Sequence, residues 1–566
     1  MDEAYRAAAW SRFEHDEFDV VVIGGGVTGA GAALDAATRG LSVALIEARD
    51  WAAGTSSRSS KLFHGGLRYL EQLEFGLVRE ALHERELMTT RLAPHLVKPV
   101  PFLYPLTHRG WERPYVAAGL ALYDTIGGRS SLPGQKHLSR RAALRVFPGI
   151  KNDAFVGAVR YFDAQADDAR HTLTVARTAA RYGAVARSST QAVGFTREAD
   201  RVVGVVLRDS EDGRETSVRA GVVINCTGVW TDEIQAMSGG RGRFQVRASK
   251  GVHIVVPREK ITGDAGLILR TETSVLFVIP WKTHWLIGTT DTDWNLDLAH
   301  PAATESDIDY LLEQVNTVLV SPLTPDDIQG VYAGLRPLLA GESEETSALS
   351  REHAVARVVP GLVSIAGGKY TTYRVMAADA VDMAADDLLK RVAPSCTDRV
   401  PLLGADGYFA MENQAEQLAG EYGLHPYRVR HLLDRYGSMI RDVLEPGLAE
   451  PTLLATVPAA PEYLLAEILY AVTHEGALHL EDVLTRRTRI SIEYPHRGVE
   501  SAPAVAALIG DALGWDAEQR ETEVADYTAR VEAERNSQRH RDDAAADQVR
   551  TAAPEARRFL RANARV

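Results

Sequence analysis

The chain has 566 residues, of which 45% are apolar and 25% are charged, a globular composition with enough length for two or three domains and a large buried ligand. The net charge of −13 disfavours nucleic acid as a partner, because phosphate binding needs a dominant basic face. Residues 1–17 lack the apolar core of a secretory signal, and no apolar run is long enough to cross a bilayer. We therefore expect a cytoplasmic protein whose membrane contacts are at most peripheral.

A strand, a glycine turn and a helix are predicted in succession near the N-terminus. The apolar run 18–23 is followed by Gly24, Gly25 and Gly26, and then by small and apolar residues at helical spacing. A second apolar run, 41–46, ends in Glu47. This pattern is typical of a βαβ unit in a parallel sheet that helices cover.

The glycines carry a dinucleotide-binding fingerprint. Gly24, Gly26 and Gly29 form G-x-G-x-x-G, in which the first glycine permits a tight turn, the second lets a pyrophosphate approach the backbone, and the third allows close packing of helix on strand. The helix N-terminus favours the phosphates. Glu47 can accept hydrogen bonds from the ribose hydroxyls, and its charge disfavours the 2′-phosphate of NADP. The segment 19–47 is therefore predicted to bind the ADP half of a dinucleotide.

The later segments favour FAD over NAD, because no second mononucleotide-binding repeat follows the first. A candidate strand at 222–225 leads to Cys226, Thr227 and Gly228, and another at 362–366 leads to Gly367, Gly368 and a helix. The N-terminus of that helix can stabilise negative charge on a reduced flavin. Short β runs from 247 to 293 lie between them. We predict an interrupted FAD-binding domain with an inserted antiparallel β domain.

The predicted domain limits follow from these patterns. The stretch after 400 has helical apolar stripes, and from about 518 the chain becomes charged and poor in large apolar residues, which is typical of an exposed helix or a partly disordered tail. The predicted parts are an N-terminal extension (1–17), an FAD-binding domain (18–105, 155–245 and 350–395), a substrate-binding domain (106–154 and 246–349), a C-terminal helical domain (400–530) and a charged tail (531–566).

Several segments together resemble one family, the FAD-dependent glycerol-3-phosphate dehydrogenases. The glycine-rich segment 21–50 is shared by many flavoproteins, but SSKLFHGGLRYLE (59–71), GLRPL (334–338) and GGKYTTYR (367–374) are specific to this family. The resemblance also covers 250–257, 277–281 and 287–291, and runs from about 18 to the RRTR run at 486–489. It implies a Rossmann-like α/β FAD domain of the D-amino-acid-oxidase type, with an antiparallel substrate domain inserted and a C-terminal α-helical domain.

The resemblance implies oxidation of sn-glycerol 3-phosphate to dihydroxyacetone phosphate, with the C2 hydride passing to flavin N5 and the electrons to a quinone. A glycerol-3-phosphate oxidase that uses oxygen is the nearest alternative, and the motifs do not separate the two. An amine-oxidising flavoprotein fits the cation-rich segments less well, and a flavin-binding sensor without turnover is a third possibility. A homodimer on the cytoplasmic face of the inner membrane is expected.

Removal of the hydroxyl proton needs a base, for which histidine is the usual choice. We predict His253 in this role, although it could instead only orient the substrate while water takes the proton. The resemblance places Arg336 and Lys369 beside the developing alkoxide, and Arg68, Tyr69 and Arg351 on the substrate, where arginines suit phosphate. His64 is expected at the flavin. The predicted cofactor-binding residues are Gly24, Gly25, Gly26, Thr28, Gly29, Glu47, Ser57, Lys61, His64, Gly65, Gly66, Thr227, Gly228, Gly368, Lys369 and Thr371.

Two further patterns have competing interpretations. The segment 109–129 holds aromatic residues around an apolar helix flanked by arginines, which fits either an anchor at the membrane surface or a buried core helix. No metal is predicted: the two cysteines, Cys226 and Cys396, are far apart, and His474 and His479 are five residues apart, which would place them on different helix faces. Two thiols in a reducing compartment are the expectation.

Overall fold

A computed structural model describes residues 1–66, 74–108, 110, 112–116, 118–119, 132–239, 244–271, 275–340 and 352–560. The predicted substrate residues Arg68, Tyr69 and Arg351, and most of the segment 109–129, lie outside these ranges. Within them, no helix is both long enough and apolar enough to cross a membrane.

The predicted βαβ unit forms the centre of a large sheet in the order β17-β18-β10-β1-β2-β7, in which β1 pairs in parallel with both β2 and β10. Val20 and Val22 of β1 pack under helices, whereas Val21 and Ile23 face the opposite side. The strands are β1 (Glu17–Ile23), β2 (Val43–Ile46), β7 (Val185–Arg187), β10 (Glu215–Asn225), β17 (His353–Val359) and β18 (Leu362–Gly367), with β8 (Thr190–Glu198) and β9 (Arg201–Asp209) forming a hairpin beside β10.

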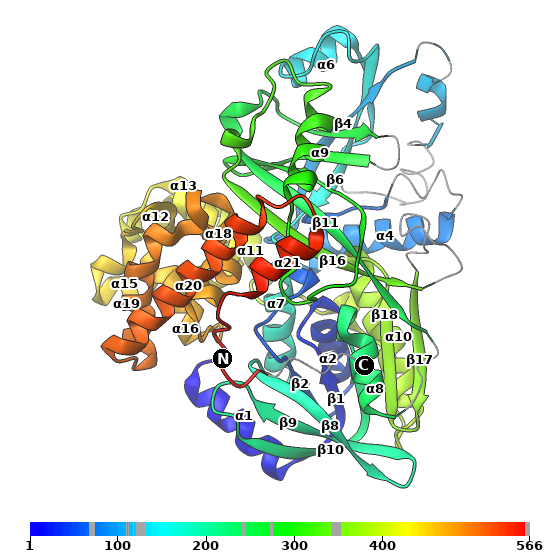
Figure 1. The fold of residues 1–566 in the computed structure, drawn as a ribbon, viewed down its shortest axis with the longest axis vertical. Helices are drawn as coiled ribbons and strands as arrows, with labels where there is room; N and C mark the ends of the chain where they lie inside the picture. Colours follow the sequence, from blue (N-terminus) through cyan, green and yellow to red (C-terminus); the bar gives the residue numbers. More distant parts are fainter. Residues whose placement is uncertain are drawn as a thin grey trace.

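Three helices cover one face of this sheet, and the hairpin and the N-terminal helix cover the other (Figure 1). The covering helices are α2 (Val27–Thr38), α7 (Asp168–Arg181) and α10 (Tyr373–Ala385), with α1 (Glu3–His15) opposite. Trp10 and Phe13 of α1 are buried against the sheet. The N-terminal extension is thus an integral layer of the domain.

The inserted domain is built on a second, ten-stranded sheet with the order β15-β11-β14-β13-β12-β4-β6-β3, to which β16 and β5 are added at β11 and β6. Its strands are β3 (Leu62–Phe63), β4 (Lys98–Leu106), β5 (Lys136–Ser139), β6 (Gly157–Gln165), β11 (Val246–Pro257), β12 (Gly266–Arg270), β13 (Val275–Trp281), β14 (His284–Gly288), β15 (Thr292–Trp294) and β16 (Gly330–Leu339). The helices around it are α4 (Phe75–Leu87), α6 (Arg140–Val146) and α9 (Glu305–Asn316), whereas α8 (Thr231–Met237) packs on the FAD sheet.

The domain limits differ from the prediction at three strands, β3, β4 and β6. β3 lies within the predicted FAD-binding range 18–105 but pairs with β6. Residues 98–105 and 157–165 were assigned by sequence to the FAD-binding domain, but β4 and β6 pair with each other over nine residues from Lys98↔Gln165 to Leu106↔Gly157, and β4 also pairs with β12. Both strands therefore belong to the inserted sheet. Their apolar side chains, among them Phe102 and Tyr161, fill a core shared with Ile279 and Leu286.

The C-terminal helical domain lies beside both sheets, as the yellow and orange helices of Figure 1 show. Its helices are α11 (Tyr408–Asn413), α12 (Ala415–Tyr422), α13 (Pro426–Tyr436), α14 (Ile440–Leu444), α15 (Pro446–Ala449), α16 (Leu465–Thr473), α17 (Leu480–Asp482), α18 (Ile490–Glu493), α19 (Ala502–Leu513) and α20 (Ala517–Ser537), with a small hairpin of β19 (Thr456–Val457) and β20 (Ala460–Leu464). The RRTR run connects this domain to the FAD domain: Arg487 binds Asp50, and Arg489 binds Asp167 and Asp168.

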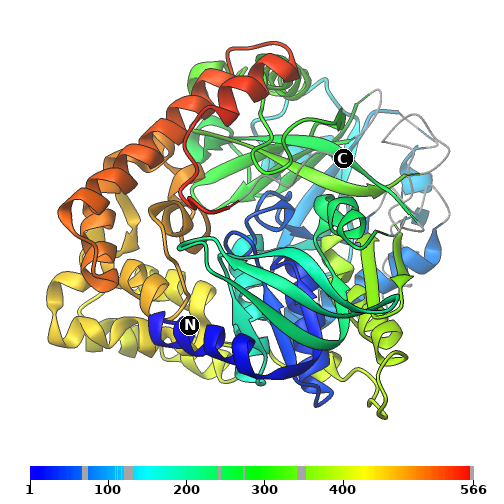
Figure 2. The same cartoon turned by 60° about the horizontal axis from the view of Figure 1, so that its bottom comes forward.

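The charged tail is folded and partly buried in its described residues, 531–560, whereas the sequence favours an exposed helix or a partly disordered tail. After α20 the chain forms α21 (Asp543–Thr551) and then runs across the molecule (Figure 2). Ala546, Arg550 and Arg557 are all buried. The burial of the tail could not be predicted from sequence, because its buried arginines form ion pairs with carboxylates of distant segments, such as Arg557 with Asp482. No local pattern reveals such pairs.

Candidate functional site

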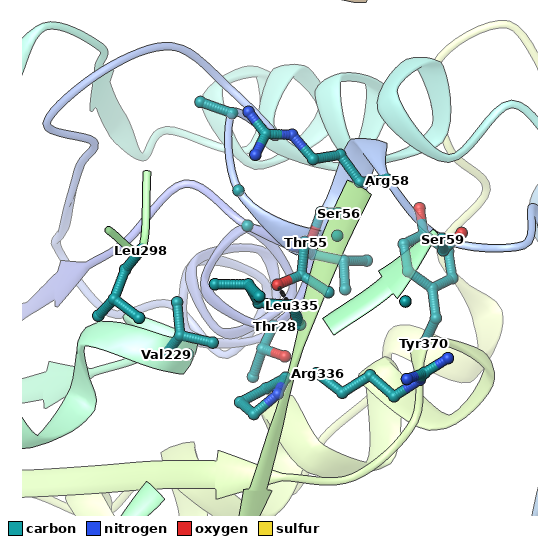
Figure 3. Close-up of a pocket in the computed structure, with 18 of the residues that line it drawn as sticks. Thr28, Thr55, Ser56, Arg58, Ser59, Val229, Leu298, Leu335, Arg336 and Tyr370 are labelled. Carbon is teal, nitrogen blue, oxygen red and sulfur yellow. Dashed lines mark hydrogen bonds between the residues drawn. The ribbon is translucent and has the colours of Figure 1, made fainter. Parts of the chain in front are cut away.

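A cavity of about 1320 Å³ lies between the two sheets and is lined by the glycine turn, the segments after β10 and β18, and strands β11 and β16. This exceeds the range of about 300–1,000 Å³ for drug-sized ligands. Thr55 Oγ1, on the loop after Glu47, donates to the carbonyl oxygen of Leu335 on β16 at 2.5 Å (Figure 3). The cavity wall is therefore continuous from the FAD domain to the inserted domain.

The glycine turn at one end of the cavity tolerates no side chain. Gly24 has φ +112°, and a Cβ atom there would lie 2.7 Å from the carbonyl oxygen of Cys226. A Cβ on Gly29 would lie 1.9 Å from the carbonyl oxygen of Gly24. Gly26 is the N-cap of α2 and provides no capping side chain. Gly26 and Thr28 line the cavity, so the N-terminus of α2 faces it. Exposed N–H groups at a helix N-terminus suit a pyrophosphate.

Glu47 lies beside this turn, as the fingerprint predicts. Its carboxylate accepts hydrogen bonds from the backbone N–H groups of Gly25, at 2.6 Å, and Arg49, at 2.8 Å. Burial raises the pKa of Glu47, and the two backbone hydrogen bonds oppose this shift. A carboxylate has about four acceptor positions, so Glu47 keeps capacity for ribose hydroxyls.

The opposite part of the wall is built where β18 ends. Gly367 and Gly368 both adopt positive φ, of +80° and +79°, which lets the chain turn before Lys369 and into α10. Lys369 and Thr371 line the cavity. Thr371 Oγ1 accepts a hydrogen bond from the backbone N–H of His64 at 3.3 Å. The segment after β18 is therefore tied to the family-specific segment around His64.

His253 projects from β11 into the same region. Its Nε2 atom lies 2.9 Å from Ser60 Oγ, and its ring stacks on Tyr332 with centroids 4.8 Å apart and an interplanar angle of 9°. Burial, with the nearby Lys61 and Arg336 cations, holds the pKa of His253 well below its usual range. The imidazole is thus neutral at physiological pH, which is the form that accepts a proton.

Arg336 lies one strand away, on β16, whose residue Tyr332 pairs with His253. Its guanidinium donates to Ser249 Oγ at 3.2 Å and Thr289 Oγ1 at 2.9 Å. His253, Arg336 and Lys369 all line this cavity. His253 and Arg336 come from the paired strands β11 and β16, and Lys369 comes from the segment after β18.

Most predicted cofactor residues also line the cavity, namely Gly24, Gly26, Thr28, Glu47, His64, Gly66, Thr227, Gly228, Gly368, Lys369 and Thr371. Gly25, Gly29, Ser57 and Gly65 lie behind the wall. Gly25 orients Glu47, and Gly29 allows the close packing described above.

Lys61 is not a cavity residue, which corrects the prediction. Its ammonium is buried and donates to Asp168 Oδ1 at 2.8 Å and to the carbonyl oxygen of Ser57 at 3.1 Å. Burial, with Arg489 nearby, lowers the pKa of Lys61 to about 8. Arg489 donates to the same carbonyl oxygen of Ser57 and to Asp168. Lys61 therefore fixes the loop that carries Ser60, behind Tyr332.

Several residues of the cavity wall were not predicted from the sequence. Arg49, Arg58 and Arg270 line the cavity, as do Trp230 and Phe277. Burial, with Arg550 nearby, lowers the pKa of Arg58 to about 10. Arg58 directly precedes the family-specific segment 59–71, and this position could have marked it as a candidate site residue. Arg270 ends an ordinary β run, and nothing in the sequence marks it.

The described residues contain no group of histidine, cysteine and acidic side chains able to hold a metal ion. The glycine turn, the α2 N-terminus and Glu47 fit the ADP half of FAD, and the cavity extends from there to the His253 wall. A flavin ring at that wall would lie beside the start of α10.

Comparisons with known proteins agree with this fit. Residues 19–374 match the family described as FAD dependent oxidoreductase, and residues 395–520 match the C-terminal domain of alpha-glycerophosphate oxidase. The chain is 68% identical over 552 residues to a glycerol-3-phosphate dehydrogenase of Mycobacterium leprae, covering 98% of this chain and 94% of that protein. It is 36% identical over 530 residues to the mitochondrial glycerol-3-phosphate dehydrogenase of Bos taurus, covering 90% and 72%.

A solved structure has the same architecture. The glycerol-3-phosphate dehydrogenase of Bacillus halodurans, determined in complex with FAD, superposes with a TM-score of 0.77 at 29% identity and covers 94% of this chain and 97% of its own. The overall arrangement of FAD domain, inserted sheet and helical domain is therefore shared along nearly the whole chain.

Proposed function

Because the chain belongs to the family of FAD-dependent glycerol-3-phosphate dehydrogenases, we propose that His253, Arg336 and Lys369 carry out the oxidation of sn-glycerol 3-phosphate to dihydroxyacetone phosphate. The observation that supports this assignment is that a buried histidine with a lowered pKa and two cations line the same cavity. When bound, FAD supplies at N5 the acceptor for the C2 hydride.

Each of the three side chains has a role that follows from its chemistry. His253 accepts the proton of the C2 hydroxyl, and Ser60 keeps its ring in place. Arg336 and Lys369 stabilise the developing alkoxide, because fixed cations in a buried site act more strongly than in water. Arg336 is itself oriented by Ser249 and Thr289, so its reorganisation during the reaction is small.

The phosphate group of the substrate needs further cations, which we assign to Arg68 and Arg351, with Tyr69 beside them. These residues lie outside the described ranges, and the family resemblance supports the assignment. Arg270, at the end of β12 on the cavity wall, is a further candidate because a guanidinium can bind phosphate through two parallel hydrogen bonds.

The test of the histidine is the rate of flavin reduction. On anaerobic addition of glycerol 3-phosphate, the visible flavin absorbance of the wild-type protein should bleach. His253→Asn should slow this step by about 10²–10⁴-fold, the usual contribution of a general base, with FAD content unchanged. His284→Asn is the matched control: His284 is also buried in this sheet, pairs with Gln329 and is not a wall residue. A His253→Asn protein that reduces FAD within a few-fold of wild type would exclude His253 as the base.

We further propose that a quinone takes the electrons at the membrane surface, since the relatives that span most of this chain are named as dehydrogenases. Oxygen is the alternative, because the C-terminal segment matches a domain named for an oxidase. Turnover with a soluble quinone analogue, compared with peroxide formation in air, separates the two. Rapid peroxide formation without quinone reduction would favour the oxidase.

A further inference from the structure

The last part of the C-terminal tail, residues 538–560, forms part of the cavity wall: Thr551, Ala553, Glu555 and Leu560 line the cavity. The two family matches end at residues 374 and 520, so neither includes this segment. In Figure 2 the tail runs from α21, over the inserted sheet, toward the FAD domain.

One end of the tail is fixed to the inserted domain. The backbone N–H of Glu305 donates to the carbonyl oxygen of His540 at 2.9 Å. Asp543 forms an ion pair with the buried Lys250 of β11. Ala546 is fully buried in an apolar cluster with Trp294 and other residues of the inserted sheet. Residues 540–546 are therefore held against the inserted domain.

The other end is fixed to the FAD domain, through Ser189 and Ser210, and to the helical domain, through Asp482. Arg557 Nε donates to Ser189 Oγ at 2.7 Å, and its Nη2 atom pairs with Asp482 at 2.9 Å, with both ionic side chains almost fully buried. The backbone N–H of Phe559 donates to the carbonyl oxygen of Ser210 at 3.2 Å. The segment between Ala546 and Arg557 thus spans from one domain to the other.

Glu555 lies between these two anchors and contacts the ribose end of the cavity. Its carboxylate pairs with Arg49 Nη1 at 2.5 Å and His300 Nε2 at 3.2 Å. The backbone N–H of the same Arg49 donates to Glu47, the predicted ribose acceptor. Arg530 of α20, which is buried and also lines the cavity, donates to the carbonyl oxygen of Pro554 at 2.5 Å. The tail is therefore connected to Glu47 through Arg49.

We propose that residues 551–560 form the outer wall of the FAD site at its adenosine half, and that FAD enters and leaves only when this segment lifts. Glu555 holds the segment closed by binding Arg49 and His300. The tail thereby controls retention of the cofactor, while the chemistry takes place at the His253 wall.

The first experiment measures FAD release after dilution of the holoenzyme, from the rise in free-flavin fluorescence. Truncation after Ala552 keeps α21 but removes Glu555 and Arg557, and should release FAD about 10- to 100-fold faster, as expected for the loss of buried charge-assisted hydrogen bonds. Glu555→Gln should be intermediate, at about 3- to 10-fold. Arg541→Ala is the matched control, because this tail side chain is largely exposed and should leave release unchanged.

A second readout tests the coupling in the opposite direction. Because Thr551, Glu555 and Leu560 line the cavity, bound FAD should contact the closed tail and stabilise it, so trypsin should cleave at Arg557 and Arg558 more slowly in the holoenzyme than in the apoprotein. Equal FAD release from the wild type, the truncated protein and Glu555→Gln would overturn the proposal, as would cleavage that does not respond to FAD. If the variants had a lower melting temperature but released FAD no faster than wild type, the tail would stabilise the fold without controlling FAD release.

Discussion

Asp168→Asn tests whether the buried ion pairs behind the active-site wall stabilise the fold. Asp168, at the start of α7, accepts hydrogen bonds from Lys61 and Arg489, and its side chain and those of both partners are at most 2% exposed. Asparagine keeps an acceptor for the backbone N–H of Ser59 but removes the negative charge. Lys61 then remains buried without its carboxylate partner and keeps the carbonyl oxygen of Ser57 as a hydrogen-bond acceptor.

The expected loss can be estimated from these contacts. Each charge-assisted hydrogen bond contributes about 1.5–3 kcal/mol, and removing one partner of a buried pair usually costs about 3–5 kcal/mol. Arg489 keeps a second carboxylate, Asp167, at 2.7 Å, so the unpaired ammonium of Lys61 dominates. We therefore expect Asp168→Asn to lower the free energy of unfolding by about 3–5 kcal/mol.

Urea unfolding with saturating FAD measures this change, and a double-mutant cycle separates its cause. Lys61→Met removes the ammonium, so the double variant should be more stable than the sum of the two single losses predicts, with a coupling energy of at least about 1 kcal/mol. Because a chain of several domains need not unfold in one step, only differences within the same transition are compared. A loss below about 1 kcal/mol in Asp168→Asn, or additive losses, would refute the reasoning.

Two further predictions concern the glycine turn and a buried histidine. Gly29→Ala places a Cβ atom 1.9 Å from the carbonyl oxygen of Gly24, so the purified variant should lose most of its FAD. The ratio of flavin to protein absorbance measures this loss. Gly76→Ala is the control and should keep its FAD, because a Cβ atom there meets no atom within 4 Å. Burial opposes a charged His479, but hydrogen bonds to Glu211 and Glu523 raise its pKa to about 10. Since this pKa lies above the unfolded value of about 6.5, the imidazolium stabilises the fold fully below about pH 6.5, and the contribution is lost as the pH rises to about 10. The difference in melting temperature between wild type and His479→Gln should therefore shrink over that interval, and a constant difference would contradict the assignment.

The local part of this architecture could be predicted from sequence. The βαβ unit and its fingerprint depend on contacts within about thirty residues. The predicted strand and helix are confirmed and Glu47 directly follows β2, while its contact with the ribose stays a prediction. Arg336 and Lys369 could be selected only through the family resemblance, because an isolated arginine or lysine is usually a surface residue, whereas His253 could be selected because proton removal needs a base. All three line the same cavity.

The non-local part could not be predicted. The pairing of β4 with β6 depends on which of many apolar strands meet in space, and each strand alone fits either sheet. Lys61 and Arg58 lie three residues apart in the same segment, yet Lys61 is sequestered by Asp168 whereas Arg58 reaches the cavity. The partners that decide this difference come from α7 and the C-terminal domain, far away in sequence.

The order of the strands in the FAD sheet also affects how the protein is made. β1 ends at residue 23 but pairs with β10, which ends at residue 225, so 225 − 23 = 202 residues must follow before that pairing is complete. At about 5–20 residues per second of synthesis, this takes roughly 10–40 seconds. β18, Arg489 and the tail emerge later still. A ribosome-bound chain therefore carries its glycine fingerprint long before it can hold FAD, and premature termination before residue 553 would yield a protein with an open cofactor site.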